Sequence, residues 1–189
     1  MSRNRAVTLM DLLVGTVIFA LILLSVSVIN IFSQKEIRIS DRNSQCQKEA
    51  AYVLEYIIKE IYNGIGDFSH PAVVSTTIDS NPSIIIRKDS NRNGMIDLIP
   101  ADLQSAFVYN ADSYEIFYYP DVSSPSRLVI SKNIFMPDFV PAIKDNYITI
   151  EITACWDPGG KKSHADCGSQ DNPLVTMKNR ITMPSVSTH

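Results

Sequence analysis

The stretch LLVGTVIFALILLSVSVINIFSQ, residues 12–34, runs for 23 residues without a charge. At about 1.5 Å per residue, a helix of this length spans the roughly 30 Å hydrocarbon core of a bilayer. No comparable run occurs elsewhere in the 189 residues, so the sequence predicts one membrane pass. Arg3 and Arg5 precede the run and residues 1–6 contain no acid, which favours a cytoplasmic N-terminus and an exported chain over 35–189.

A secretory signal peptide is the alternative interpretation of this segment. Such a peptide has an apolar core of about 7 to 15 residues followed by a small-residue cleavage site. Here the run is longer, Asp11 stands at its start, and nothing after Gln34 looks like such a site. We therefore expect the segment to stay in the mature protein as an anchor.

Helical periodicity continues past residue 34. Apolar residues recur on one helical face, with charged residues between them. This stripe comprises Ile39, Cys46, Ala50, Val53, Leu54, Ile57, Ile58 and Ile61. Gly64 and Gly66 end the pattern. The sequence therefore predicts one helix of more than fifty residues, with a transmembrane half over 7–34 and an amphipathic half over 35–64.

Residues 65–189 have the composition of a β-rich domain. Short runs of β-branched and aromatic residues alternate with Pro, Asn, Asp and Ser. Strands are expected near 83–88, 113–119, 127–131, 147–155 and 174–183. The expected fold class is α+β, in which the long N-terminal helix packs on an antiparallel sheet in the head.

The junction RAVTLMDLLVGTVIFA, residues 5–20, resembles the processing site of the type IV prepilin family. A basic leader, residues 1–6, ends in the small residue Ala6, and Val7 would be the first mature residue. Asp11 then occupies the fifth mature position. The family usually has Gly, then Phe or Met, and Glu at these three places, so this chain departs from the pattern at each. The resemblance implies cleavage between Ala6 and Val7 by a prepilin peptidase and N-methylation of Val7.

Asp11 has two interpretations. A carboxylate at a helix centre in lipid costs about 2.5 to 3.5 kcal/mol, so it is normally retained for a function. The family resemblance implies that it meets the α-amino group of a neighbouring mature subunit and sets the axial register. Alternatively, it is a headgroup-level acid that the dipole at the helix N-terminus favours.

The three cysteines, Cys46, Cys155 and Cys167, allow three disulfide pairings. A bond from Cys155 to Cys167 would close a loop in WDPGGKKSHADCG, residues 156–168, which has plausible hairpin content and resembles the C-terminal disulfide loop of many pilins. We favour this pair, because Cys46 lies on the apolar helical stripe and fits a buried thiol. A zinc site of Cys155, His164 and Cys167 is a weaker alternative, since it has only three ligands at unusual spacing.

The segment DSNRNGMID, residues 89–97, matches the first nine positions of a calcium loop. Oxygen ligands would come from Asp89, Asn91, Asn93, the Met95 carbonyl and Asp97, and Gly94 would form the sharp turn. The twelfth position, normally Glu, is Pro100, so Asp102 is considered as a late ligand. The alternative is an Asn-Gly turn between strands with incidental acids. Calcium is the cofactor that the sequence predicts.

The composition gives little support for nucleic-acid binding or catalysis. The net charge is -3, so there is no bulk basicity, although nucleic acid stays undecided as a partner. No nucleophile elbow, HExxH or phosphate loop occurs, and no small-molecule substrate or enzymatic activity is expected. Tyr114, Tyr118 and Tyr119 form a cluster that suits either a binding face or cross-strand packing.

The order of elements after residue 45 resembles minor pilins of the PilW type and the J-type pseudopilins of type II secretion. The resemblance rests on QCQKEAAYVLEYIIKEIYNGIG, residues 45–66, followed by a strand, DSNRNGMID and two further strands. It implies a low-copy inner-membrane subunit with a periplasmic head that primes or caps a pilus or pseudopilus. Its partners would be a prepilin peptidase and other minor and major pilins or pseudopilins. The alternatives are a filament-displayed adhesion or binding module, a DNA-uptake pilus subunit and, least supported, a membrane-anchored enzyme.

Overall fold

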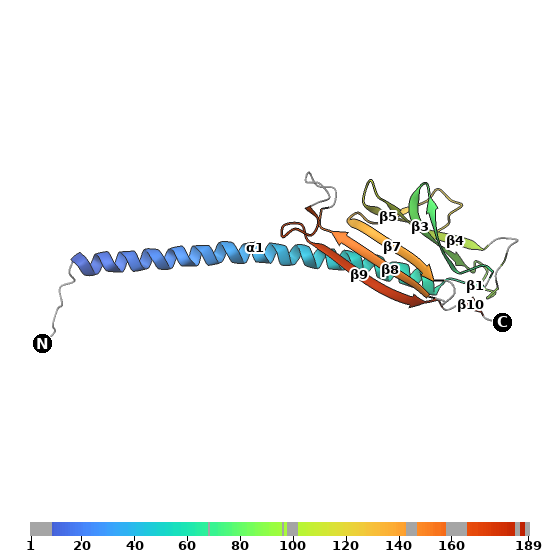
Figure 1. Cartoon of the computed structure of the whole chain (residues 1–189), viewed down its shortest axis with the longest axis horizontal. Coiled ribbons are helices and arrows are strands. Elements are labelled where there is room, and N and C mark those ends of the chain that lie inside the picture. The colour runs from blue at the N-terminus through green and yellow to red at the C-terminus, as the bar shows by residue number, and fades with distance from the viewer. Residues whose placement is uncertain are drawn as a thin grey trace. The chain divides into compact units, whose positions relative to one another are not determined.

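The computed structural model describes residues 9–67, 69–95, 97, 102–142, 147–157, 166–183 and 186–187. Two compact units make up the chain, residues 1–41 and residues 42–189. Helix α1, Leu9–Tyr62, is continuous over 54 residues (Figure 1). This confirms the single long helix that the apolar run and the stripe predicted.

The end of α1 coincides with the predicted glycine. Asn63 N donates to Glu60 O and Gly64 N donates to Ile61 O, which tightens the last turn. A Cβ on Gly64 would lie 3.0 Å from Ile61 O and 3.3 Å from a methyl group of Ile86. A side chain would thus crowd both the helix end and the sheet, which is why glycine suits this exit.

Five strands of the head form an antiparallel meander in chain order. They are β2 (Val73–Ile78), β3 (Asn81–Lys88), β4 (Leu103–Asn110), β5 (Glu115–Tyr119) and β6 (Leu128–Ser131). Asp79 and Ser80 join β2 to β3 with φ of 51° and 65°. Two positive φ values are the signature of the tight turn that matches strand twist.

A second antiparallel sheet contains β7 (Ile134–Ala142), β8 (Tyr147–Cys155) and β9 (Leu174–Thr182), with β8 in the middle. Two short strands, β1 (Gly66–Asp67) and β10 (Val186–Ser187), pair in parallel. The antiparallel α+β class is therefore confirmed, but the head has two antiparallel sheets where one was expected. The sequence prediction located β3, β5, β6, β8 and β9 and did not identify β2, β4 or β7.

The core of the head lies between the C-terminal part of α1 and the inner faces of both antiparallel sheets, and β7, β8 and β9 lie along this part of the helix in Figure 1. Most of the apolar stripe of α1 is buried as predicted, with Val53, Ile57 and Ile61 fully inaccessible, while Ile39 and Ile58 are half-buried. Full burial of one such side chain contributes about 1.5 to 3 kcal/mol. The ring of Tyr56 packs edge-on against Phe107, with centroids 5.7 Å apart.

Candidate functional site

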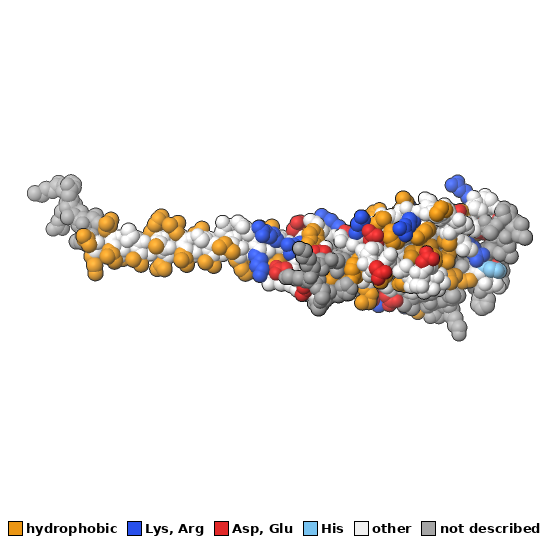
Figure 2. All heavy atoms as spheres, turned by 90° about the horizontal axis from the view of Figure 1, so that it is seen from above, with side chains coloured by type: hydrophobic (Ala, Val, Ile, Leu, Met, Phe, Trp, Pro, Cys, Tyr) orange, Lys and Arg blue, Asp and Glu red, His pale blue; other side chains and the backbone are white. Residues whose placement is uncertain are grey.

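The first half of α1 is an apolar surface exposed all round. Every residue from 9 to 34 is exposed, and large side chains such as Leu9 and Ile31 are 82% and 71% accessible. On the face seen in Figure 2, hydrophobic side chains follow this part of the helix, and Lys and Arg side chains gather beyond it. Among the described residues, α1 is the one helix that is both long enough and apolar enough to cross a membrane.

Three hydroxyl groups in this segment bond to carbonyl groups of the helix itself. Thr16 donates to Leu13 O at 2.8 Å, and Ser25 and Ser27 donate to carbonyl groups one turn earlier at 2.8 and 2.9 Å. Gln34 donates to the Asn30 side chain at 3.4 Å. Polar groups bonded in this way cost less in a hydrocarbon environment than unbonded ones do.

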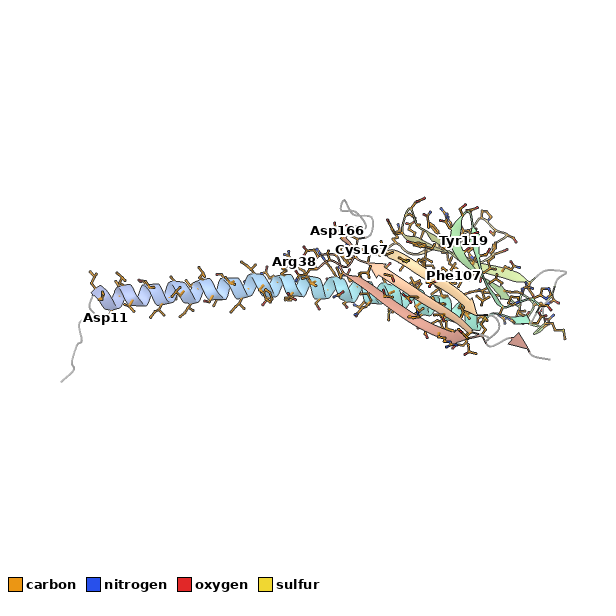
Figure 3. The ribbon with its side chains drawn as sticks, in the orientation of Figure 1. Asp11, Arg38, Phe107, Tyr119, Asp166 and Cys167 are labelled. Carbon is orange, nitrogen blue, oxygen red and sulfur yellow. A yellow bond between two sulfur atoms is a disulfide. The ribbon has the colours of Figure 1, made fainter. Side chains whose placement is uncertain are left out.

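Asp11 lies in the first turn of α1 as described (Figure 3), which is where a helix dipole favours a carboxylate. This position suits both interpretations of Asp11 and does not separate them. Ala6 and Val7, the expected processing site, lie outside the described residues.

The segment 89–97 forms a tight loop around its own polar side chains. The Asp89 carboxylate accepts from Asn93 N at 3.2 Å and from Gly94 N at 2.6 Å. Burial alone would raise the pKa of Asp89, but the N–H groups that it accepts lower it overall, so this carboxylate is charged at neutral pH. Gly94 has φ of 75°, which explains the glycine at this turn.

The other predicted ligands converge on Asp97. Asn91 and Asn93 both donate their amide groups to Asp97 Oδ2, at 2.6 and 2.9 Å. Met95 N bonds to the Asn93 side chain at 2.7 Å. Asp102, only 6% exposed, accepts from Asp97 N at 2.8 Å. The loop therefore gathers the predicted residues together with Asp102.

No group of three or more His, Cys, Asp or Glu residues in the described ranges is arranged to hold a metal ion. The oxygen atoms of the loop are instead engaged in the hydrogen bonds given above. Pro100, at the twelfth position of the calcium pattern, lies outside the described residues. The geometry is that of an Asx-rich turn whose donor atoms, carboxylate and amide oxygens, are the type that calcium takes.

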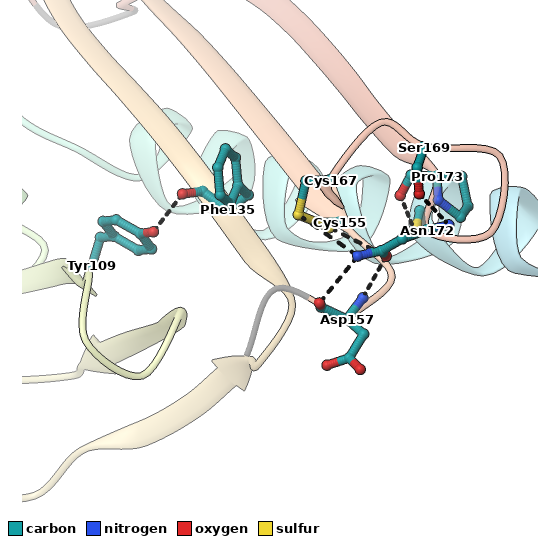
Figure 4. The surroundings of a disulfide bond; sticks show 9 residues. Tyr109, Phe135, Cys155, Asp157, Cys167, Ser169, Asn172 and Pro173 are labelled. Carbon is teal, nitrogen blue, oxygen red and sulfur yellow. Dashed lines mark hydrogen bonds between the residues drawn. A yellow bond between two sulfur atoms is a disulfide. The ribbon is translucent and has the colours of Figure 1, made fainter. Parts of the chain in front are cut away.

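Cys155 and Cys167 form a disulfide with a Cα–Cα distance of 5.9 Å, the pair that the sequence analysis favoured. Beside it, Asn172 donates to Asp157 O at 3.2 Å and accepts from Asp157 N at 3.0 Å (Figure 4). This pair of bonds holds both ends of the loop together independently of the sulfur atoms. His164, the third residue of the zinc alternative, lies outside the described residues.

The residues after Cys167 contact the amphipathic half of α1. Arg42 donates to Asp171 O and lies 5.9 Å from the centre of the Trp156 ring. Cys46 is a buried free thiol, as predicted, with its Sγ 3.8 Å from Pro173 O. Burial, followed by the nearby charge of Glu49, raises the pKa of this thiol, so it is protonated and unreactive at neutral pH.

The tyrosine cluster is not an exposed binding face. Tyr114 and Tyr118 are 8% and 5% exposed, and Tyr118 points into the core. The cross-strand packing interpretation is therefore correct for these two residues. Tyr118 is buried because the inner face of β5 packs against α1, a contact that the local sequence does not reveal, whereas Tyr114, which precedes β5, stacks on Phe135 with ring centroids 6.2 Å apart.

A polar cluster that the sequence analysis missed links α1 to the sheet. Lys88 forms an ion pair with Glu60, and the Tyr118 hydroxyl bonds to both, at 2.9 Å in each case. Burial lowers the pKa of Lys88, but its bonds to Glu60 and Tyr118 outweigh that effect and raise it. The only signal in the sequence was an acid at the edge of an apolar helical stripe.

Comparison with known proteins adds no identification. No protein-family model, curated protein or solved structure matches this chain.

Proposed function

We propose that this chain is a type IV pilin-like subunit, anchored in the inner membrane by the first half of α1 and carrying a periplasmic head. Its role is that of a low-copy minor pilin or pseudopilin that primes or caps a filament. The partners are a prepilin peptidase, neighbouring pilins or pseudopilins and the bilayer. The proposal makes it a structural subunit and not an enzyme.

The exposed apolar half of α1 carries this proposal. A helix that is hydrophobic all round needs lipid or another helix around it. The same helix continues into a half whose apolar stripe is buried in the head core. One continuous helix with these two halves combines an apolar anchor with a segment packed in the head, which is what a filament subunit extracted from a membrane requires. The prepilin-like junction at residues 5–20 adds independent support.

The processing step gives the most direct test. Mass spectrometry of the protein from cells with a prepilin peptidase should find a mature chain that begins at N-methylated Val7. The same chain from cells without that peptidase should begin at Met1. A chain that begins at Met1 in both strains, or one cut after Gln34, would contradict the proposal.

The filament role is tested at Asp11. Asp11→Asn removes a charge from an apolar segment, so insertion and head folding should be unchanged. Incorporation into filaments should fall because the contact with the neighbour's α-amine is lost, whereas Asp11→Glu should be tolerated. For a priming subunit, the number of filaments should fall more than their length. Normal incorporation of the Asn variant would favour the helix-dipole interpretation of Asp11.

A filament-displayed binding module is the second candidate. The burial of Tyr114 and Tyr118 removes one of its two proposed surfaces, which leaves the disulfide loop. Deletion of that loop should leave filaments intact and abolish attachment if this second function is correct. Loss of filaments instead would favour assembly.

We further propose that the segment over residues 89–97, with Asp102 as a late ligand, binds calcium. The support is the calcium-type spacing of the oxygen-bearing side chains of Asp89, Asn91, Asn93 and Asp97. A ligand that binds only the folded state raises the melting temperature. Millimolar calcium should therefore stabilise the protein, and Asp97→Asn should abolish the increase while magnesium reproduces little of it. An unchanged melting curve would favour the simple turn.

A further inference from the structure

A cavity on the outer face of the five-stranded sheet is not part of the sites described above. Val73 and Ile86 are fully buried and pair across β2 and β3. Successive side chains in a strand point to opposite faces, so Val74 and Arg87 point away from the core. Arg87 pairs with Gln104 of β4. A solvent-open cavity of about 160 Å³ lies between these outward side chains.

The lining of this cavity combines apolar residues, the neutral polar residues Thr76 and Gln104, and one cation. Ala72, Val74 and Ile85 supply apolar surface, and Gln104 supplies a polar side chain. Arg87 is the one charged residue in the lining. Its Nε is buried and has no hydrogen-bond partner among the described residues. The ion pairs found in the described part of the chain do not include Arg87.

Arg87 brings a permanent positive charge to the lining of this open cavity, and a charged donor binds a carboxylate more strongly than a neutral acceptor. The cavity therefore favours an anionic oxygen at its Arg87 end. On the volume scale used here, one water molecule needs roughly 10 to 15 Å³. The cavity of about 160 Å³ is therefore several times larger than a carboxylate group alone. The remaining volume, lined in part by Val74 and Ile85, suits apolar atoms of the same ligand.

We propose that this cavity binds an acidic side chain of a partner protein, in a segment where a Glu or Asp is flanked by apolar residues. Charge complementarity selects the carboxylate, and the apolar wall selects its neighbours. A free organic acid fits less well, because small ligands are usually held in cavities that enclose most of their surface. An open cavity suits a ligand whose own protein covers the opening. The proposal stands apart from the pilin-like function, since it concerns recognition by the head alone.

The test is peptide binding by the full chain in detergent micelles, measured by fluorescence anisotropy. The probe is the labelled, capped peptide acetyl-Ala-Val-Glu-Val-Ala-amide, whose only charge is the Glu carboxylate. The matched peptide with Gln in place of Glu should bind about ten- to a hundredfold more weakly, the range expected for a lost charged hydrogen bond. Equal binding of the two peptides, or no binding up to about 5 mM, would overturn the proposal.

Variants locate the site. Arg87→Gln should weaken binding of the Glu peptide about ten- to a hundredfold, and Arg87→Lys should retain part of it. Arg127→Gln is the matched control, because Arg127 lies over the Phe117 ring, 4.2 Å from its centre, and does not line the cavity. Binding that falls equally in Arg127→Gln would show general charge attraction and overturn the proposal.

A second variant covers the case in which Arg87→Gln does not fold. Val74 is 37% exposed, so Val74→Asp should fold, and its carboxylate should occupy the Arg87 end and abolish peptide binding. Unchanged binding by Val74→Asp would contradict the proposed site. Isovalerate, a free branched acid, is the final arm: it should bind at least about tenfold more weakly than the peptide. Equal affinity would assign the cavity to small organic acids instead of a protein partner.

Discussion

Removal of the Cys155–Cys167 disulfide should lower the free energy of unfolding by about 3 kcal/mol. The perturbation is the double variant Cys155→Ala/Cys167→Ala, compared with the oxidised wild-type protein, and the reduced wild-type protein is the matched control. The two cysteines are 12 positions apart in sequence. In the chain-entropy relation, closing a loop of that length removes about 9.5 cal/mol/K from the unfolded chain, which is about 2.8 kcal/mol at 25 °C.

The folded state should change little, because other contacts hold this region. Asn172 and Asp157 keep their two hydrogen bonds, and Arg42 still bonds to Asp171 O. The loss of unfolding free energy should therefore arise in the unfolded chain, and the circular dichroism spectrum of the folded protein should be retained. Some additional loss will come from the volume of the buried Cys155 sulfur in the double variant, but not in the reduced wild-type protein.

The assay is urea unfolding of the full chain in detergent micelles. Trp156, the single tryptophan, is partly buried against the core beside this disulfide and reports the transition. The oxidised protein should exceed the reduced protein by about 3 kcal/mol, with the double variant at or slightly below the reduced value. A difference under about 1 kcal/mol, or a native spectrum that changes on reduction, would refute the loop-entropy reasoning.

Two further predictions concern the core of the head. Ile57→Ala should lower the free energy of unfolding by about 2 to 5 kcal/mol, because Ile57 is fully buried. Ile37→Ala is the control and should lower it little, because Ile37 is 67% exposed on the same helix. Similar losses for both variants in urea titrations would argue against the assigned core face. Burial raises the pKa of Tyr109 to about 12, and its hydroxyl donates to Phe135 O at 2.5 Å. The unfolded tyrosine ionises near pH 10 while the folded one stays neutral, so stability should fall as the pH rises from about 10 to about 12. Tyr109→Phe should flatten that decline, and an equally steep decline in the variant would assign it to other groups.

The helix shows most clearly what the sequence alone can determine. The uncharged run over residues 12–34 and the stripe through Val53 and Ile57 are local patterns, and each reflects contacts along one helix. The helix length, its end near Gly64 and the buried thiol of Cys46 followed from them. The calcium-type spacing over 89–97 likewise located a loop whose side chains converge.

The missed strands show where local patterns fail. β4 is buried on both faces over Ser105–Tyr109, so it lacks the alternation by which a half-buried strand is identified. β7 contains Pro137 and Pro141, which argue against a strand unless it lies at an edge, and β7 is an edge strand of its sheet. Whether a strand has one solvent-facing side or an open edge depends on its neighbours.

The tertiary structure alone decided which polar groups meet. Glu60, Lys88 and Tyr118 come from the helix and two different strands, and only packing α1 on the five-stranded sheet brings them together. The same is true of the cavity at Arg87, whose lining depends on the register of β2, β3 and β4. The physical reason is the sequence distance between contacting residues. Contacts along a helix join residues three or four positions apart, so their pattern can be recognised in the sequence. Contacts in a sheet join distant segments, and their pairing follows from the best burial of the whole chain.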